Sequence, residues 1–203
     1  MRSYRWFVIL FLGFLLFSCA KARTYHLYLR YQPGRDFPSL QQKIGPTLGV
    51  LPLKDERAET LYIGIHTPSQ GVSSYFRSEP FPLEKAIGDS LTEVLSREGV
   101  RIVPVSSWDG RPESLKNMET ESVLMIEIRA FWVEAKAAYF KTDAKASARF
   151  IIHLGVKKEG KVYTKNVAVE KEKTVFRLKP EDVERMLNEI LTEIFDSFFS
   201  NPY

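Results

Sequence analysis

The sequence of 203 residues contains a single cysteine and three histidines, and this scarcity excludes several kinds of site. Cys19 has no second cysteine with which to form a disulfide, so the fold has to be held together by packing. His26, His66 and His153 lie far apart, and none has the His/Cys/Glu spacing typical of a zinc site. We therefore expect neither a metal ion nor a cofactor.

The short motifs that carry enzyme chemistry are also missing. The sequence has no Gly-x-Ser-x-Gly nucleophile elbow and no phosphate-binding Gly-x-x-x-x-Gly-Lys-Ser/Thr loop. Asp55 and Asp109 each follow a predicted strand, where α/β sheets often place sites, although turn chemistry also explains an aspartate there. We expect a protein that is not an enzyme. The alternative is a small enzyme or a lipid-binding protein with a site near Asp55 and Asp109.

An excess of charge of one sign is absent as well. The chain has 29 Lys and Arg against 25 Asp and Glu, and no run of five basic residues occurs. If the N-terminal residues 1–18 are removed, Arg2 and Arg5 leave with them, and 27 basic residues face 25 acidic ones. Nucleic-acid binding usually needs a stronger basic balance, so no nucleic-acid partner is expected.

The one long hydrophobic run lies at the N-terminus. Two arginines precede the apolar stretch 6–17, which is followed by Ser18, Cys19 and Ala20. Positive charge, an apolar run and small residues, in that order, are typical of a secretory signal peptide. The run is about 12 residues long, whereas a membrane-spanning helix needs roughly 20. Residues 1–18 are therefore predicted to be a signal peptide.

The residues around the cysteine carry a more specific signal. Leu16-Phe17-Ser18-Cys19 resembles the lipobox of bacterial lipoproteins, in which the cysteine is acylated and the chain is cut before it. The resemblance implies lipidation at Cys19 and a membrane anchor of several acyl chains, which together hold stably. Ala20 resembles an outer-membrane address, which implies attachment to the outer membrane, facing the periplasm. An ordinary signal peptide with a chance cysteine is the alternative.

The rest of the chain is predicted to form one domain with a short N-terminal extension. Residues 19–46 should hold the lipidated N-terminus, an edge strand with alternating aromatic residues at 25–31, and a connector rich in proline and glycine. Residues 47–203 should form a periplasmic α/β domain that begins with short strands at 47–53 and 61–65.

Two segments have the apolar spacing of amphipathic helices. The first helix is expected at about 82–98, before Gly99, and the second at about 180–200. A strand at 100–105 follows the first helix. The order of a strand, this helix and the second strand predicts a βαβ-like unit with a right-handed crossover.

Three strands are predicted between these helices. Residues 122–133 have apolar side chains at every even position from 124 to 132, and residues 144–156 alternate throughout. A turn containing Gly160 leads into a returning strand at 162–175, whose charged end at 170–173 should project beyond the sheet. The expected fold class is α/β (α+β), with a single mixed sheet, an antiparallel C-terminal meander and two main packing helices.

The segment 66–82 is predicted to be the longest irregular part of the domain. It contains Tyr75, Phe76 and Phe81 among glycine, serine and proline residues. Exposed aromatic side chains are frequent at protein interfaces, so these three are candidates for contact with a partner protein. The alternative is that their rings pack into the core.

The order of these elements resembles the YajG-like and ABC-type transport auxiliary lipoproteins. The likeness covers about 47–199 and depends on the lipobox, the strand and turn Gly49–Asp55, the first helix with Gly99-Val100, and the meander closed by a helix. The N-terminal domain of TolB and the lipoprotein activators of penicillin-binding proteins are related modules. The resemblance implies a non-enzymatic accessory that binds another envelope protein in a transport or maintenance system. An activator of a peptidoglycan synthase is the alternative.

Overall fold

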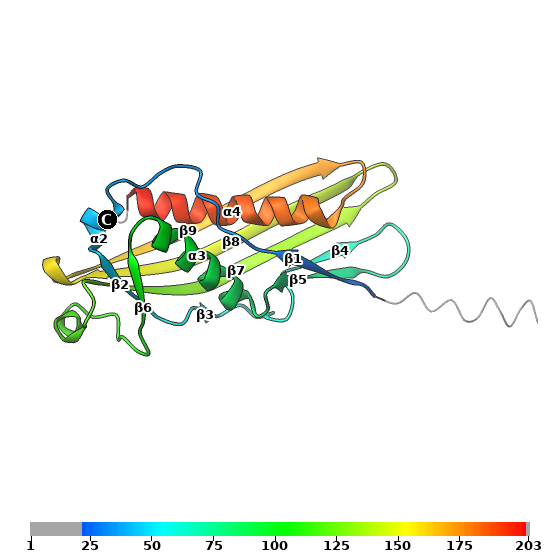
Figure 1. Ribbon diagram of the computed structural model, residues 1–203. Coiled ribbons are helices and arrows are strands. Elements are labelled where there is room, and N and C mark those ends of the chain that lie inside the picture. Colours follow the sequence, from blue (N-terminus) through cyan, green and yellow to red (C-terminus); the bar gives the residue numbers. More distant parts are fainter. Residues whose placement is uncertain (1–21, 202–203) are drawn as a thin grey trace, which may run out of the picture.

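The computed structural model describes residues 22–201, and the predicted signal peptide and Cys19 lie outside the described residues. A mixed sheet of nine strands is assembled around one long strand, β7 (Ser122–Ala137). β8 (Thr142–Val156) pairs antiparallel with β7, and β9 (Lys161–Val175) pairs antiparallel with β8 (Figure 1). This confirms the predicted C-terminal meander.

The other edge of β7 is shared by three short strands that follow one another along it. β2 (Thr47–Val50), β3 (Lys54–Asp55) and β4 (Gly64–Thr67) each run parallel to β7. The segment 47–67 therefore runs beside β7 from one end of that strand to the other.

Three further strands extend the sheet on either side. β5 (Ser74–Glu79) is antiparallel to β4, and β1 (Thr24–Tyr28) lies parallel to β5 as the predicted edge strand. β6 (Arg101–Pro104) lies parallel to β2 at the opposite edge.

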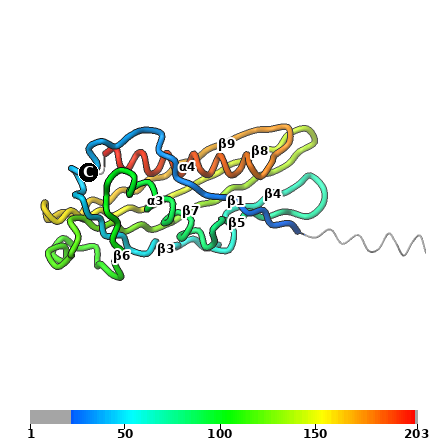
Figure 2. The backbone as a smooth tube through the Cα atoms, in the orientation of Figure 1, coloured from blue at the N-terminus to red at the C-terminus, as the bar shows by residue number. Residues whose placement is uncertain are grey.

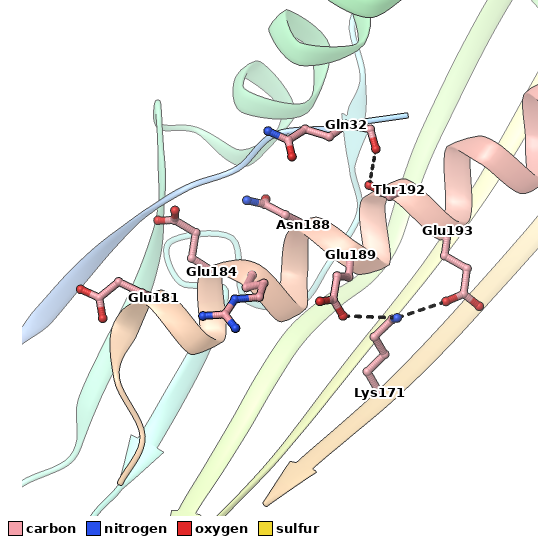
Figure 3. A pocket seen from close by; sticks show the side chains of 9 residues that line it. Gln32, Lys171, Glu181, Glu184, Asn188, Glu189, Thr192 and Glu193 are labelled. Atoms are coloured by element: carbon pink, nitrogen blue, oxygen red, sulfur yellow. Dashed lines mark hydrogen bonds and ion pairs between the residues drawn. The ribbon is translucent and has the colours of Figure 1, made fainter. Parts of the chain in front are cut away.

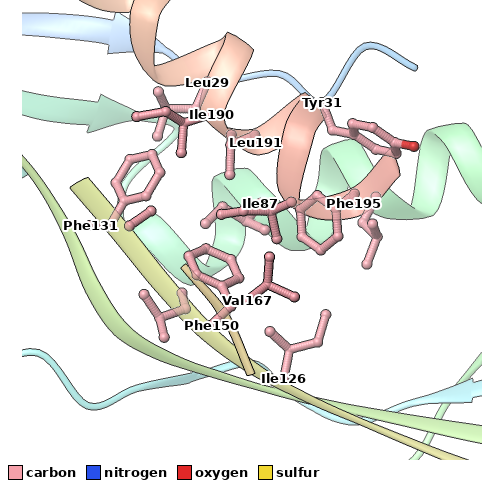
Figure 4. Close-up of a cluster of buried hydrophobic side chains, with 14 of the residues drawn as sticks. Leu29, Tyr31, Ile87, Ile126, Phe131, Phe150, Val167, Ile190, Leu191 and Phe195 are labelled. Atoms are coloured by element: carbon pink, nitrogen blue, oxygen red, sulfur yellow. The ribbon is translucent and has the colours of Figure 1, made fainter. Parts of the chain in front are cut away.

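Two long helices pack on this sheet. α3 (Leu83–Arg97) and α4 (Pro180–Ser200) match the two segments predicted from apolar spacing. Their buried side chains join those of the sheet in one core cluster, where the rings of Phe150 on β8 and Phe195 on α4 meet edge to face with centroids 5.9 Å apart (Figure 4). The α+β fold class expected from the sequence is confirmed.

Shorter helices complete the described chain. α2 (Leu40–Ile44) lies within the predicted connector, and the 3₁₀ helix η2 (Lys157–Glu159) forms the turn before Gly160, which has a positive φ of 60° as expected. The 3₁₀ helix η1 (Glu113–Asn117) covers a second, smaller core cluster. Because successive side chains of a strand point to opposite faces, the Val123 of this cluster lies on the face of β7 opposite to α3 and α4.

A β-bulge changes which side chains of β7 face the core. Ile126 and Ile128 are buried before the bulge, and Phe131 and Val133 are buried after it. Arg129 is the extra residue, because Ile128 and Ala130 oppose consecutive residues of β8. The apolar even positions noted in the sequence therefore face the core only as far as residue 128, since one inserted residue exchanges the two faces.

The charged segment 170–173 does not project beyond the sheet, because β9 stays paired with β8 up to its last residue. Its alternating charges are instead divided between the two faces. The Nζ of Lys173 lies 2.9 Å from Asp182 on α4, whereas Glu170 and Glu172 lie 3.0 and 3.2 Å from the Nζ of Lys145 on β8. Strand alternation thus sends the lysines toward the helix and the glutamates away from it.

The segment 66–82 is not irregular, because β5 and the end of β4 form a hairpin within it. The expected βαβ-like unit also differs in its connections. α3 connects β5 to β6, but the strand that pairs in parallel with β6 is β2. The connection from β2 to β6 therefore contains β3, β4 and β5 as well as α3. The hairpin was not predicted from the sequence, because Pro68, Gly71 and Pro80 are typical of loops.

Candidate functional site

The segment that follows β1 is hydrogen-bonded along one side of α4, and Figure 2 shows its course beside that helix. Four polar side chains of α4 at intervals of four residues face this segment: Glu184, Asn188, Thr192 and Asp196. Four helical residues advance about 6 Å, and two extended residues advance about 6.6 Å. The two repeats are therefore nearly equal, and every second residue of the extended segment meets the next side chain of the helix. We call this row of contacts between residues 28–34 and α4 the seam.

The first contacts of this seam are made with backbone groups by Glu184 and Asn188, whose side chains project from α4 in Figure 3. The Glu184 carboxylate accepts a hydrogen bond from the backbone N–H of Tyr28 at 2.9 Å. The Asn188 side chain accepts from the N–H of Arg30 at 2.9 Å and donates to the carbonyl of Tyr28 at 3.2 Å. Such bonds satisfy the outer edge of an edge strand, which would otherwise be open to another chain.

The seam continues toward the C-terminal end of α4. The Thr192 hydroxyl donates to the carbonyl of Gln32 at 2.8 Å, and Asp196 accepts from the N–H of Gly34 at 2.9 Å. The Tyr31 hydroxyl donates to Asp196 at 2.9 Å, and the Tyr31 ring packs 5.2 Å from that of Phe195. Burial, followed by the hydrogen bond to Asp196, raises the pKa of the Tyr31 hydroxyl. Residues 28–34 are thus bonded along α4, and Leu29 and Tyr31 among them are buried in the core.

A second feature is an open groove of about 560 Å³ between α3 and the carboxyl ends of the parallel strands β2 and β6. α3 contributes Glu84, Lys85 and Asp89 to its rim, and the Nζ of Lys85 lies 2.5 Å from Asp89. Its floor is mostly apolar and consists of Val50, Leu51, Pro52, Leu53, Ile102, Pro104 and Val105. The carboxyl ends of parallel strands are where open α/β sheets most often bind ligands.

The edge strand beside this groove is poorly suited to accept another strand. Arg101 and Val105 donate their N–H groups to carbonyls of the β2 segment, at 2.8 and 3.0 Å. Alternation then turns Pro104 toward the outer edge, and proline has no N–H to donate. A partner in the groove would therefore contact side chains rather than extend the sheet.

Asp55 belongs to a buried ion pair rather than to a reactive site. The side chains of Asp55 and Arg57 are 7% and 5% exposed, and the guanidinium donates to both carboxylate oxygens at 2.7 and 2.8 Å. Its remaining N–H groups donate to the carbonyls of Thr60, Tyr62 and Phe131. Every donor of Arg57 is used, so this pair fastens the segment 56–63 to β7.

Asp109 is exposed and organises the turn before η1. Its carboxylate accepts from the N–H of Arg111 at 3.0 Å and from the Ser114 hydroxyl at 2.5 Å, and the Ser114 bond is the main cause that lowers the pKa of Asp109. Neither Asp109 nor Asp55 lines the groove. Both carboxylates thus have structural roles, and the alternative of an enzymatic or lipid-binding site near Asp55 and Asp109 stays a prediction.

The three aromatic residues predicted to contact a partner lie in different surroundings. Phe76 is 2% exposed in the main core, so its assignment as a surface contact was wrong, because its position in β5 faces inward. Tyr75 is half-buried and stacks on Tyr62 with ring centroids 4.5 Å apart. Phe81 is 44% exposed beneath the Arg77 guanidinium. Partner contact through Tyr75 and Phe81 stays a prediction.

Residues 22–201 contain no group of three or more His, Cys, Asp and Glu side chains that could hold a metal ion. No helix within the same range is long and apolar enough to cross a membrane. Neither the seam nor the groove was predicted from the sequence. The four-residue spacing of polar residues from 184 to 196 was a readable signal for the seam, but the groove depends on long-range strand pairing.

No protein-family model matches the chain, and no curated protein matches it. Among solved structures, it is similar to a Xanthomonas campestris protein of the DUF330 family, with 13% identity, a TM-score of 0.54, and coverage of 88% of this chain and 93% of the other. It is also similar to an uncharacterized protein, with 10% identity, a TM-score of 0.51, and coverage of 90% and 100%. These two likenesses show a shared fold.

A third similar structure is a lipoprotein from Neisseria meningitidis, with 12% identity, a TM-score of 0.40, and coverage of 74% of this chain and 98% of the other. The solved structures thus show that the chain shares its fold with a DUF330 protein, while membership of the YajG-like family stays a prediction.

Proposed function

We propose that this protein is a lipid-anchored accessory of the bacterial cell envelope, attached through Cys19 to the outer membrane and facing the periplasm. It binds an envelope protein of a transport or maintenance system and catalyses no reaction. The groove between α3 and the ends of β2 and β6 is the site we assign to that partner.

The observation that carries the proposal is the seam along α4. Residues 28–34 are bonded to α4, and β1 is paired with β5 from Thr24 onward. Cys19 precedes Thr24 by five residues, which span at most about 18 Å when fully extended. An acylated Cys19 would therefore hold the whole domain close to the bilayer, as an accessory of a membrane system requires.

The anchor is tested by Cys19→Ser in the full chain, with Ser18→Ala as the matched control, because alanine keeps a small residue before the cysteine. We expect the control to incorporate labelled palmitate and to fractionate with the outer membrane. Cys19→Ser should incorporate no palmitate and should be found either in the periplasm or as the uncleaved precursor. Cleavage and membrane fractionation of Cys19→Ser indistinguishable from those of the control would refute the anchor.

The partner site is tested by a photo-crosslinking amino acid in intact cells. Thr92 lines the groove on α3, and Ser96, one turn further along the same helix, is exposed outside it. A crosslinked protein recovered from position 92 and absent from position 96 would support the groove. Equal yields at both positions, or none at position 92, would count against it. A recovered peptidoglycan synthase would favour the alternative of a synthase activator over a transport accessory.

A further inference from the structure

Two neighbouring loops expose three large aromatic side chains at one end of the molecule. Tyr139 and Phe140 lie between β7 and β8 and are 90% and 78% exposed, and Phe176 lies between β9 and α4 and is 80% exposed. Exposed apolar groups that gather at one place generally mark a contact surface, whereas scattered ones do not. Strand pairing shows that these three are gathered.

The register of the meander places the three side chains at the same end of its three strands. Ala137, the last residue of β7, is opposite Thr142, and Thr142 is opposite Val175, which directly precedes Phe176. A backbone bond of 2.7 Å from the N–H of Ala138 to the carbonyl of Lys141 closes the turn. Its two central positions are thus the aromatic residues 139 and 140, where hairpins usually place Gly, Asn or Asp. We call Tyr139, Phe140 and Phe176 the aromatic tip.

The chain also enters the domain at this end. Thr24, the first residue of β1, is opposite Tyr75, Tyr75 is opposite Ile65, and Ile65 is opposite Glu134 near the end of β7. Figure 1 shows the start of β1 on the same side of the molecule as the β7–β8 turn. The seam along α4 holds this arrangement in place, because it fixes the segment that continues from β1.

The two loops that carry the aromatic tip contain basic but no acidic side chains, and acidic residues begin just beyond them, at Asp143 and Glu181. Residues 138–141 and 176–179 contain Lys141, Arg177 and Lys179 and no acidic residue. Lys141 pairs with Asp143 at 2.7 Å, while Arg177 and Lys179 are exposed. Basic side chains near a membrane are attracted to anionic lipid headgroups. Tyrosine is enriched at bilayer interfaces, because its ring can contact the apolar acyl chains while its hydroxyl stays hydrated.

We propose that the aromatic tip inserts into the headgroup region of the bilayer that holds Cys19, and that Arg177 and Lys179 bind its anionic lipids. This inference rests on the proposed function for the position of the bilayer. The acyl chains hold one point of the protein at the membrane, and the tip supplies a second point. The domain then stands with its β7–β8 turn in the bilayer and its groove, at the opposite end of β7, directed away from it.

The test places a spin label at Phe140→Cys in the full chain, purified from membranes and reconstituted into phosphatidylethanolamine vesicles containing phosphatidylglycerol. Lys116→Cys, on η1 and near the other end of β7, is the control. The chain has no cysteine besides Cys19, so one label per chain together with incorporated palmitate shows that Cys19 is acylated. Two labels, or one label without palmitate, show that the anchor itself has failed. Failure of the anchor is therefore distinguished from failure of the tip.

With one label per chain, we expect a spin label at position 140 to be several-fold more accessible to oxygen, relative to a water-soluble nickel reagent, than one at position 116. Removing phosphatidylglycerol should reduce this difference. A label at 140 as accessible to nickel as the one at 116 would overturn the proposal. An immobilised label at 140 that neither reagent reaches would also overturn it, because that result indicates contact with a protein. A label at Phe176→Cys should repeat the result for position 140.

Discussion

The hydroxyl of Tyr31 donates a hydrogen bond of 2.9 Å to the carboxylate of Asp196, and both side chains are buried. The two residues are 165 positions apart, so this bond joins the beginning of the described chain to its last helix. The backbone N–H of Tyr31 also donates to the Ser90 hydroxyl on α3, at 2.7 Å. One residue near the predicted acylation site is thereby held by both main helices.

The seam predicts a measurable loss of stability when one of its members is removed. Asn188→Ala deletes two hydrogen bonds to the backbone at Tyr28 and Arg30, and each such bond contributes about 0.5–1.5 kcal/mol. We expect the free energy of unfolding in urea to fall by about 1–3 kcal/mol. Glu193→Ala, on the same helix, removes an exposed carboxylate near Lys171 and should cost at most about 1 kcal/mol. Equal losses in the two variants would contradict the role of the seam.

Tyr31 also predicts a dependence of stability on alkaline pH. Its pKa is raised in the folded protein, so folding favours the neutral phenol. The resulting stability is fully present below the ordinary tyrosine pKa of about 10 and is lost as the pH rises above it, because the unfolded chain then releases the proton first. Tyr31→Phe should weaken the decline in unfolding free energy between about pH 8 and about pH 11, on either side of that value. A decline as steep as in the unchanged protein would argue against this account.

The buried pair of Asp55 and Arg57 predicts a larger effect from a single substitution. Arg57→Met leaves a buried carboxylate without its partner, which typically costs about 3–5 kcal/mol. The double variant Asp55→Leu/Arg57→Met removes both charges and should be less destabilised than Arg57→Met in urea unfolding. Arg149→Ala, at an exposed position of β8, is the control and should change stability by about 0.5 kcal/mol or less. A double variant worse than Arg57→Met would show that the carboxylate is not the source of the loss.

Gly155 predicts an effect of packing. A Cβ atom at this position of β8 would lie 2.5 Å from the Cδ2 of Leu115 and 2.9 Å from the Trp108 ring. Gly155→Ala should therefore displace η1 and cost about 1–3 kcal/mol, with a change in the fluorescence of Trp108. Gly88→Ala is a contrasting control, because the nearest atom to its Cβ is 3.6 Å away and alanine favours the helix by about 0.5–1 kcal/mol. A neutral Gly155→Ala variant with unchanged fluorescence would exclude the close packing.

Much of the secondary structure could be predicted because its signal lies in neighbouring residues. The apolar spacing at 83–97 and 180–200 identified both helices, and the alternation at 144–156 identified β8 and its inner face. The bulge at Arg129 could not be predicted, because beyond it both the even positions 130 and 132 and the odd positions 131 and 133 carry apolar side chains. For the same reason the sequence does not show that Trp132, an apolar residue of the even series, is left partly exposed.

The candidate sites were less predictable than the fold. Tyr75 and Phe76 are adjacent and both aromatic, and only the pairing of β5 with β1 and β4 decides which of them is buried. Asp55 follows a predicted strand, as a catalytic residue could, but its pairing with Arg57 in a buried site gives it a structural role. Composition and position in a strand cannot distinguish these cases, because burial depends on which distant segment lies opposite.

The sequence by itself determined the two helices, the alternation of the meander and the acylation signal that points to Cys19, since each is a pattern within one short stretch. The tertiary structure decided which short strands share the edge of β7, that α4 binds the segment 28–34, and that the three aromatic side chains of the tip lie together. Local periodicity reflects the geometry of one element, whereas these relations depend on the register between elements that are distant in the chain.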